Sequence, residues 1–481
     1  MTTPEGGTER TLQWTLSIVV LARFATLGIY PLSDTTEARY AEVARKMLEL
    51  GDWITQWYEY GVPFWAKPPL STWLTAGSFK LFGINEFAAR LPHFLLALLI
   101  GWLVWGWIGR RSRREALLAV ALLCGTLVFS VSAAAVMTDI TLALGTTLAM
   151  RGFWVGFHGS DSRRSREQWW LFAGLGIGLL AKGPIALILS GLPIFLWALF
   201  TGNLLSAWKR LSWIRGGLLT LAIAAPWYWL AETRTPGFLD YFFIGEHWNR
   251  FTVAGWAGDR YGSAHVAPRG SIWLLAVAAC LPWPVLLPLL TLGRKKAVLT
   301  LASETSGAQW RWYLLAWGLA PCLFFTASGN ILWTYVLPAT PALAILAAGW
   351  LAGDVRTRRV DRVVSAGLVV TLSVLGFIAW DRAVSDSWKT AKAVVAEYQI
   401  RNTENRPLLF LGDRPYSAAF YSRGKALLAV DASELALQIG RGPSFVALTP
   451  QQILELPIPL KASLQLEKLA GPFDLYSSVK N

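Results

Sequence analysis

Charged residues are scarce in this chain, and their scarcity excludes a soluble globular protein. Asp, Glu, Lys and Arg together make up 15% of the 481 residues, whereas hydrophobic residues make up 54%. The mean hydropathy is +0.42, and a soluble domain carries about 25% charged residues. We therefore predict a membrane protein that is surrounded by membrane lipids over most of its length.

Cysteine and histidine are rare as well, which limits disulfide and metal chemistry. The chain has 3 cysteines and 4 histidines. Cys124, Cys280 and Cys322 all lie in apolar stretches, so we expect free, buried thiols. No secretory signal peptide is recognisable, and residues 1–10 are expected to form a short cytoplasmic tail.

Tryptophan, in contrast, is abundant. Because amphipathic rings are favoured at bilayer interfaces, 27 tryptophans indicate many membrane crossings. Residues 11–380 are predicted to form a polytopic α-helical domain with about 11–13 transmembrane helices, each needing about 20 apolar residues. The predicted spans lie near residues 11–30, 88–109, 115–136, 140–157, 169–181, 184–200, 214–231, 270–291, 311–326, 333–352 and 363–380. The short pair around Lys182 is either two spans or one broken span.

Basic residues predict which loops face the cytoplasm. Runs of Lys and Arg occupy alternate loops, at 110–114, 163–166, 209–215, 294–296 and 356–362. The positive-inside rule places these loops in the cytoplasm, so the loops at 31–87 and 232–269 face outward. The net charge of +14 is spread over the basic loops and is not gathered on one face. A nucleic-acid partner is therefore not expected.

The composition changes after Asp381. Short apolar runs at 407–412, 425–430 and 444–448 are typical of buried strands, and 432–440 and 450–456 are typical of short helices. We predict that residues 381–481 form a small soluble α/β domain on the outward side. This segment has no His and no Cys, so no metal site is expected in it.

The first outward loop concentrates charged side chains beside the membrane, where they are costly unless they serve a function. Residues 38–50 are predicted to form an amphipathic helix along the membrane interface, ended by Gly51 in the left-handed conformation. Its predicted polar face consists of Arg39, Glu42, Arg45, Lys46 and Glu49. Asp34 would lie at the membrane edge. A structural alternative is that Asp34 and Glu37 form a capping box that opens this helix.

The charged motifs of the outward loops, taken in order, resemble those of a known family. These motifs are Asp34-x-x-Glu37-Ala-Arg39-Tyr40, Lys67-Pro68-Pro69-Leu70, Met137-Thr138-Asp139, Lys182-Gly183-Pro184, Glu246-His247-x-x-Arg250 and Tyr335-x-Leu337-Pro338. The pattern resembles lipid-phosphate-dependent glycosyltransferases of the GT-C type. The nearest branch contains the aminoarabinose transferases of lipid A and bacterial relatives of protein O-mannosyltransferases. The segment Pro415–Gly424 also resembles the soluble end of aminoarabinose transferases.

The resemblance implies an inverting transfer of a sugar from a polyprenyl-phosphate donor to an acceptor outside a bacterial inner membrane. Lipid A, another glycan or a protein would each suit as acceptor, and the active site would face the periplasm. The expected catalytic residues are Asp34, Glu37 and Asp139. The expected donor-phosphate and substrate-binding residues are Arg39, Lys67, Lys182, Glu246, His247, Arg250 and Tyr335. Cations at the leaving phosphate would stabilise its growing charge, and a carboxylate could activate the acceptor.

Two departures from the aminoarabinose transferases bear on metal and substrate. Ala66 stands where those enzymes usually carry Glu, a candidate metal ligand, and Asn330 stands where relatives often have Lys. Glu246 and His247 remain, but two ligands are too few for a typical zinc site. We predict no metal site, and a divalent cation at these residues is kept only as an alternative.

Structural alternatives remain for several of these residues. Asp139 could cap the following span, Lys67 and Lys182 could extend their charges to the interface, and Glu246 could be hydrogen-bonded to His247. Residues 174–178 carry Gly at every second position inside an apolar segment, which favours close helix packing over a dinucleotide site. A transporter or flippase is the alternative from another class, but the chain shows no repeated halves.

Overall fold

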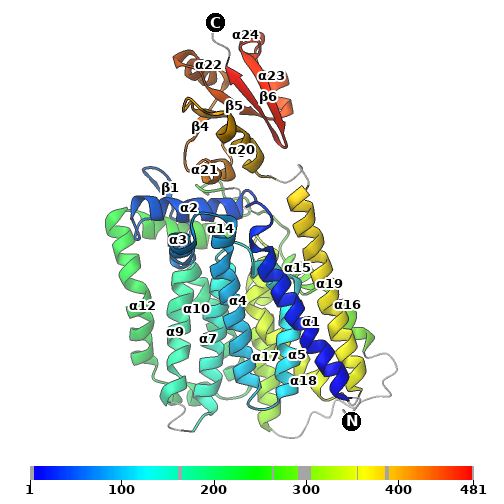
Figure 1. Ribbon diagram of the computed structural model, residues 1–481. Coiled ribbons are helices and arrows are strands. Elements are labelled where there is room, and N and C mark those ends of the chain that lie inside the picture. The colour runs from blue at the N-terminus through cyan, green and yellow to red at the C-terminus, as the bar shows by residue number, and fades with distance from the viewer. Residues whose placement is uncertain are drawn as a thin grey trace. The chain divides into compact units, whose positions relative to one another are not determined.

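The computed structural model describes residues 5–160, 165–262, 265–290, 305–354, 356–384 and 389–478. The chain forms two compact units, and each is built from segments that are distant in sequence (Figure 1). Unit 1 comprises residues 1–25, 52–74 and 90–376, and unit 2 comprises 26–51, 75–89 and 377–481. The predicted basic runs at 163–164 and 294–296 lie outside the described residues. The predicted domain boundary at residue 381 stays a prediction.

Unit 1 is a bundle of apolar helices. Helices α4, α5, α7, α9, α10, α17 and α18 lie side by side in Figure 1. The helices in or entering this unit are α1 (Glu5–Ala25), α3 (Leu70–Phe82), α4 (Glu86–Ile108), α5 (Arg113–Gly125), α6 (Leu127–Ser132), α7 (Asp139–His158), α9 (Trp169–Lys182), α10 (Ile185–Phe200), α11 (Leu204–Arg210), α12 (Trp213–Arg234), α13 (Phe238–Asp240), the π-helix η2 (Tyr241–Asn249), α14 (Arg250–Thr252), α15 (Ile272–Ala279), α16 (Trp283–Leu289), α17 (Thr305–Phe325), the 3-10 helix η3 (Trp333–Ala339), α18 (Thr340–Ala352) and α19 (Thr357–Val384). A short hairpin of β1 (Trp57–Glu59) and β2 (Val62–Pro63) completes it.

Several predicted spans are broken in the structure. Within the described residues, five helices are long and apolar enough to cross a membrane, and α15 with α16, bent by 69°, makes up to six. The predicted span 115–136 is divided into α5 and α6, and the pair at 169–200 is two separate helices, α9 and α10. This count includes only described helices that reach the length and hydropathy of a complete crossing, so the number of about 11–13 transmembrane helices stays a prediction.

Glycine packing joins α7 to α9. A Cβ at Gly174 would lie 2.5 Å from the Gly145 carbonyl oxygen, and one at Gly145 would lie 2.8 Å from the backbone nitrogen of Gly178. Only glycine permits this approach, so the predicted helix packing at 174–178 is confirmed. The three cysteines are free as predicted, although Cys124 and Cys280 are half-buried and Cys322 alone is buried.

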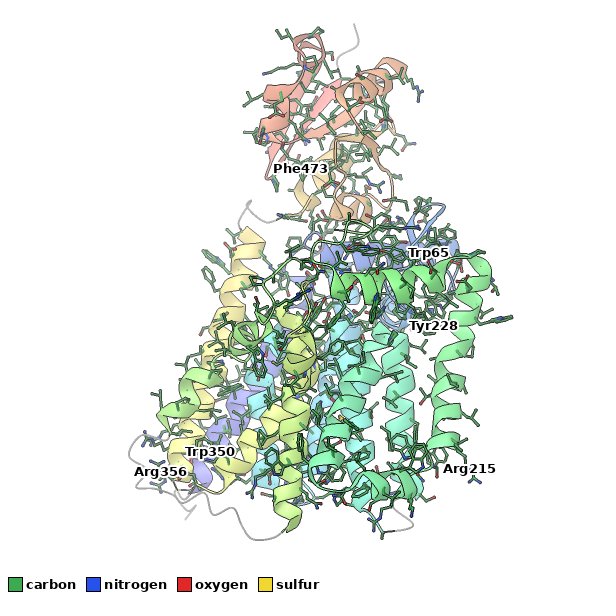
Figure 2. All side chains as sticks on the ribbon, turned by 180° about the vertical axis from the view of Figure 1, so that it is seen from behind. Trp65, Arg215, Tyr228, Trp350, Arg356 and Phe473 are labelled. Atoms are coloured by element: carbon green, nitrogen blue, oxygen red, sulfur yellow. The ribbon has the colours of Figure 1, made fainter. Side chains whose placement is uncertain are left out.

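The two ends of the unit 1 bundle differ in side-chain character. Figure 2 places Arg215 and Arg356 at one end, together with Trp350, and Trp65 at the opposite end. Arg215 and Arg356 belong to two of the predicted cytoplasmic loops, whereas Trp65 belongs to a predicted outward loop. This arrangement agrees with the alternation of basic loops in the sequence.

Unit 2 contains a five-stranded sheet in the order β4-β3-β5-β7-β6. Strands β3, β4 and β5 are parallel, and β7 runs antiparallel to both β5 and β6. Its elements are η1 (Thr26–Gly28), α2 (Thr36–Leu50), α20 (Lys392–Arg401), β3 (Leu408–Leu411), α21 (Tyr416–Tyr421), β4 (Ala426–Ala429), α22 (Ala432–Arg441), β5 (Phe445–Leu448), α23 (Pro450–Glu455), α24 (Ile458–Ala462), β6 (Leu464–Ala470) and β7 (Phe473–Ser478). Two apolar clusters cover the two faces of the sheet.

Helix α2 occupies the predicted position but buries its predicted polar face. Gly51 ends the helix with φ of 66°, as expected. Glu42, Arg45 and Lys46 are only 1–2% exposed. The Arg45 guanidinium donates to Glu42 at 2.6 and 2.8 Å and to Glu49 at 2.6 Å. The predicted polar face is therefore largely buried, and its charges compensate one another along the helix.

Candidate functional site

A π-helix places Glu246 and His247 in unit 1. Helix η2 spans nine residues, and π-helical turns are frequent at functional sites. Gly183, which follows α9 with φ of 83°, allows η2 to approach. A Cβ there would lie 2.5 Å from the Phe242 ring and 3.2 Å from the His247 ring. The Lys182-Gly183-Pro184 break and η2 are therefore fitted to each other.

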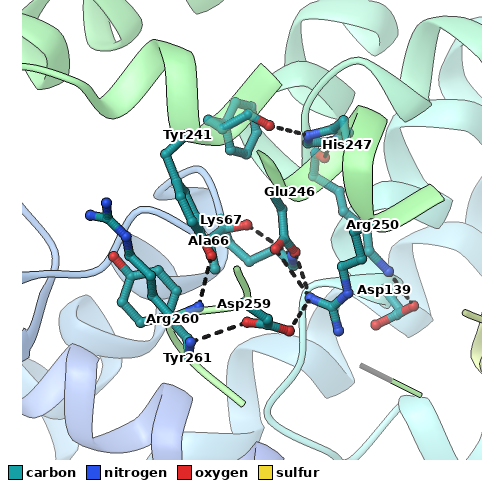
Figure 3. Close-up of polar contacts among 12 residues, drawn as sticks. Ala66, Lys67, Asp139, Tyr241, Glu246, His247, Arg250, Asp259, Arg260 and Tyr261 are labelled. Carbon is teal, nitrogen blue, oxygen red and sulfur yellow. Dashed lines mark hydrogen bonds and ion pairs between the residues drawn. The ribbon is translucent and has the colours of Figure 1, made fainter. Parts of the chain in front are cut away.

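Four charged residues meet at this position: Lys67 from a loop, Glu246 from η2, Arg250 from α14, and Asp259 from the loop that follows (Figure 3). The Lys67 ammonium donates to a Glu246 carboxylate oxygen. The Arg250 guanidinium donates to both oxygens of Glu246 at 2.9 and 3.1 Å, and it lies 3.4 Å from Asp259. Each of the four side chains is less than one-fifth exposed. We call Lys67, Glu246, Arg250 and Asp259 the charge cluster.

Backbone contacts hold Lys67 in position. The Gln56 side-chain amide donates to the Lys67 carbonyl oxygen at 2.6 Å, and Thr72 donates to Gln56 at 2.5 Å. Pro68 and Pro69 follow directly and restrict the backbone to extended conformations. The backbone that carries the Lys67 side chain is thus conformationally restricted.

Burial and pairing set the protonation of the charge cluster, which lies outside the predicted spans. Burial lowers the pKa of Lys67 to about 8, although Glu246 opposes the shift. Burial would raise the pKa of Glu246, but Lys67 and Arg250 hold it below its usual value. Burial likewise opposes the charge of Arg250, yet Glu246 raises its pKa. Glu246 is therefore held ionised between the Lys67 ammonium and the Arg250 guanidinium.

A second ion pair lies at the start of α7. The Lys182 ammonium donates to Asp139 at 2.7 Å and lies 4.9 Å from the centre of the Tyr335 ring. Helix α7 has Thr138 at its N-cap, without a side-chain capping bond. The alternative that Asp139 serves as a helix cap is therefore wrong, and its carboxylate is committed to Lys182.

His247 connects η2 to the end of α9. Its Nδ1 lies 2.7 Å from the Phe242 carbonyl oxygen and its Nε2 lies 3.2 Å from that of Lys182. Burial lowers the pKa of His247. Glu246 pairs with Lys67 and Arg250, so the alternative of a Glu246–His247 hydrogen bond is wrong. Within the described ranges, no group of three or more His, Cys, Asp or Glu side chains could hold a metal ion.

Asp34 belongs to unit 2, where it contacts the first turn of α21. Its carboxylate accepts hydrogen bonds from the Ser417 backbone nitrogen at 3.0 Å and from the Ser417 hydroxyl. Burial raises the pKa of Asp34 to about 6, against the effect of the Ser417 hydrogen bonds. Helix α2 instead has Thr35 at its N-cap, without a side-chain bond. The capping-box alternative for Asp34 is therefore wrong.

Glu37 and Arg39 also lie in unit 2. Glu37 is 4.0 Å from the Arg382 guanidinium. The Arg39 guanidinium lies over the rings of Tyr40 and Tyr416 at 5.5 and 5.8 Å. The ten predicted site residues thus fall into two groups: Asp34, Glu37 and Arg39 in unit 2, and Lys67, Asp139, Lys182, Glu246, His247, Arg250 and Tyr335 in unit 1.

Sequence reasoning missed Asp259 and its neighbours. Asp259 accepts from the Tyr261 backbone nitrogen at 3.1 Å, which aims its other oxygen toward Arg250. The Arg260 guanidinium lies 5.1 Å from the ring centres of both Trp65 and Tyr241. The adjacent acidic and basic residues in the outward loop 232–269 were the available signal. Their partners are distant in sequence and could not be identified from it.

Asn330, noted above as a departure, fastens the segment that carries Arg250. Its amide nitrogen donates to the carbonyl oxygens of Arg250 at 2.6 Å and Val253 at 2.8 Å. Its amide oxygen accepts from the Gly255 backbone nitrogen at 3.2 Å. The side chain is buried, and its three bonds use the donors and acceptor that an amide offers. A lysine could not reproduce this pattern because it has no acceptor.

Comparison with known proteins places these residues in a family context. Residues 17–242 match the family model of dolichyl-phosphate-mannose-protein mannosyltransferases. The undecaprenyl phosphate-alpha-4-amino-4-deoxy-L-arabinose arabinosyl transferase of Enterobacter sp. is 30% identical over 418 residues, covering 82% of this chain and 70% of that protein. The enzyme of the same name from Erwinia tasmaniensis is 34% identical over 334 residues, covering 67% of this chain and 56% of that protein. The chain thus spans only part of the length of these relatives.

A solved structure supports the fold. The crystal structure of ArnT from Cupriavidus metallidurans bound to undecaprenyl phosphate matches with a TM-score of 0.77 and 21% identity, over 97% of both chains. The predicted fold class is confirmed: a polytopic helical membrane protein of the GT-C type with a small C-terminal α/β domain.

Proposed function

Because the chain belongs to the family of undecaprenyl phosphate-aminoarabinose arabinosyl transferases, we propose that it is an inverting glycosyltransferase. The donor would be a polyprenyl-phosphate-linked sugar, and the acceptor would lie outside the membrane. The observation that carries the proposal is the charge cluster in unit 1. Lys67 and Arg250 are cations held at low exposure, which suits recognition of a lipid phosphate.

The charge cluster offers a physical route for phosphate binding. In the described structure Glu246 neutralises both Lys67 and Arg250. A donor phosphate would compete with Glu246 for these cations, and its charge grows as the sugar leaves. Hydrogen-bond donors that already point at that charge in a poorly hydrated site stabilise the transition state without further reorganisation. Lys182, with Asp139 as its partner, would supply a further cation.

The proposed role of Asp34 is to activate the acceptor. With a pKa near 6, its carboxylate is mostly ionised at neutral pH and can accept a proton. The Ser417 hydrogen bonds fix its orientation. Glu37 and Arg39 would help to hold the segment that carries Asp34 in its conformation. The residue roles rest on the family resemblance together with this local geometry.

The proposed acceptor is lipid A, on the resemblance of the sequence motifs to the aminoarabinose transferases of lipid A. The family match over residues 17–242 favours a protein hydroxyl as the second candidate. The proposed location is the bacterial inner membrane, with the charge cluster facing the periplasm. The basic residues Arg215 and Arg356 at the opposite end of the unit 1 bundle from Trp65 support this orientation (Figure 2).

The test is transfer by the purified full-length protein. Undecaprenyl-phosphate aminoarabinose would be offered with lipid A, and separately with a hydroxyl-bearing acceptor peptide, and products would be followed by mass spectrometry. Asp34→Asn is expected to lower transfer about 10²- to 10⁴-fold, the usual contribution of acid–base catalysis. Glu455→Gln, which alters an exposed carboxylate of unit 2 that does not act on Asp34, serves as the control. Donor moved across vesicles without modification of either acceptor would refute the enzyme proposal.

A further inference from the structure

Unit 2 holds a cavity that the proposed chemistry does not use. Its volume is 520 Å³, within the roughly 300–1,000 Å³ of small-molecule sites. The lining comes from the turn at residues 84–86, from helix α20 and the turn after it at 392–405, and from the end of α21 at 420–425. Three segments that are distant in sequence therefore build one concave surface within this unit.

Two cations of the cavity are not committed to other groups. Arg423 and Lys425 line it and are exposed, and no ion pair or hydrogen bond of their side chains occurs among the described residues. The third cation, Lys392, is paired with Glu86 at 2.5 Å. The lining thus sets one carboxylate against three cations, and two of those cations remain available. Such a surface attracts an anionic ligand.

The rest of the lining suits a saccharide. Gln399 and Asn402 each donate one amide N–H to a backbone carbonyl oxygen, of Tyr421 and of Arg406. Each keeps a second N–H and an oxygen lone pair, which can donate to and accept from sugar hydroxyls. Tyr421 contributes an aromatic ring, against which the apolar face of a sugar can pack. The ring of Phe420 is only 2% exposed and packs against Phe79 instead. A bare inorganic anion would use the cations alone. The combination of amides, one ring and cations fits a sugar that carries a phosphate.

Backbone conformation singles out the same cavity. Asn405 and Arg423, each with φ of 55°, are the only non-glycine residues with positive φ in the part of the chain that the structure describes. Both line the cavity. Such conformations are strained for residues that carry a side chain, and they cluster at ligand-binding sites. Arg423 follows α21 at a position that glycine usually occupies, so the structure bears this strain while presenting a cation.

The cavity is joined to the Asp34 segment through α21. Asp34 contacts Ser417 in the first turn of this helix, and the cavity lies at its last residue and beyond. The helix has six residues, which corresponds to roughly 9 Å of rise. The Tyr421 hydroxyl at the cavity accepts from the Leu32 backbone nitrogen at 2.8 Å and donates to Glu86 at 3.0 Å. A ligand in the cavity would therefore lie one short helix away from the carboxylate.

We propose that this cavity binds the phosphorylated saccharide headgroup of the acceptor, with Arg423 and Lys425 on a phosphate. The identification of the ligand as acceptor rests on the proposed function. Lipid A carries two phosphates on a glucosamine disaccharide, so one phosphate can be held here while the other is presented for transfer. The cavity is then an acceptor-anchoring subsite, separate in its residues from the charge cluster.

The experiment measures binding without donor and without turnover. Isothermal titration calorimetry would use the full-length protein in detergent and deacylated lipid A, which is the bisphosphorylated disaccharide alone. The double variant Arg423→Gln/Lys425→Gln is expected to weaken binding about tenfold or more, because charge-assisted hydrogen bonds are lost. The matched control Arg441→Gln/Lys461→Gln removes two exposed cations of the same unit that do not line the cavity. It is expected to bind as the wild type does.

Further probes identify the source of the phosphate. The dephosphorylated disaccharide and inorganic phosphate are both expected to bind at least about tenfold more weakly than the intact probe. Tight binding of inorganic phosphate alone would overturn the saccharide assignment, and unchanged binding by the double variant would overturn the cavity itself. Equal loss in the control variant would do the same, since the effect would be general electrostatics.

Kinetics separate this proposal from the proposed function. In the transfer assay the double variant is expected to raise the KM for lipid A while leaving kcat and the donor KM unchanged. If the wild type transfers no sugar but binds the disaccharide through Arg423 and Lys425, the enzyme proposal fails and the cavity stands. If transfer occurs and the KM for lipid A does not change, the cavity proposal alone fails.

Discussion

Both units bury ion pairs, but those of α2 in unit 2 lie within one helix, whereas the Lys67–Glu246 pair of unit 1 joins segments that are distant in sequence. In unit 2, Glu42 and Arg45 are three residues apart on one helix. In unit 1, the Lys67–Glu246 pair joins residues that are 179 positions apart. Pairs within one helix compensate charges that the helix carries anyway. Pairs between segments distant in sequence form only when the fold brings opposite charges together, and their burial has a desolvation cost. Such a costly pair is typical of a site where the charge serves a function.

This comparison predicts that the two sets of pairs fail in different ways. Loss of a partner in α2 is expected to affect folding stability. Loss of Lys67 from the charge cluster is expected to affect substrate binding and catalysis more than stability, because Glu246 keeps both hydrogen bonds from Arg250. Each variant below separates these outcomes.

The largest effect is expected at α2. Glu42→Gln leaves Arg45 and Lys46 buried without their shared carboxylate, and breaking such a buried pair costs about 3–5 kcal/mol. Thermal and denaturant unfolding of the purified protein would measure the loss. Glu49→Gln is the matched control: its carboxylate is 45% exposed, so less than about 1 kcal/mol should be lost. Equal losses in the two variants would contradict the account of α2.

An intermediate effect is expected from pH. Asp34 must be ionised and Lys67 protonated, so transfer should fall as pH drops through about 6 and as it rises through about 8. Lys67→Arg keeps its charge at all accessible pH values. This variant is expected to be slower but to lose the alkaline limb. Rates of transfer between pH 5 and 9.5 would decide, and an unchanged alkaline limb would assign that limb to another group.

The smallest effect is expected at Asn330, which contributes no charge. Asn330→Leu leaves the carbonyls of Arg250 and Val253 without their amide donor. Because this loosens the backbone that carries Arg250, the donor KM is expected to rise about tenfold with a smaller change in kcat. Initial rates at varied donor concentration would measure this. A changed kcat with constant donor KM would argue against a positioning role.

The sequence predicted the helices and strands better than it predicted which charged side chains pair with one another. The strands β3, β4 and β5 and the helices α22 and α23 lie where short apolar runs placed them. Strand β6 was missed because Leu464–Ala470 alternates only weakly and places few residues in the core. Strand β7 is mostly buried, but its Asp474, Ser477 and Ser478 interrupt the apolar run that would have indicated a buried strand. The cation positions Lys67 and Lys182 were identified from motifs. Their pairing was not, because it depends on how distant loops are brought together.

Asp34 illustrates the limit of local sequence reasoning. From its neighbours, a capping box with Glu37 was a reasonable alternative. In the structure its carboxylate contacts Ser417, 383 positions away. Asp259 was missed for the same reason, since nothing near it in sequence indicates Arg250 as its partner. A single sequence shows which residues can carry charge but not which charges meet.

The central claim is that the buried cations of the charge cluster hold the donor phosphate. The most direct measurement is the binding of undecaprenyl phosphate to the purified protein, compared between the wild type and Lys67→Met. Lys80→Met, which removes an exposed lysine, is the control. We expect Lys67→Met to weaken binding about tenfold or more without a change in its unfolding temperature. Lys80→Met is expected to bind with the affinity of the wild type. Equal affinity of the wild type and a folded Lys67→Met protein would contradict it.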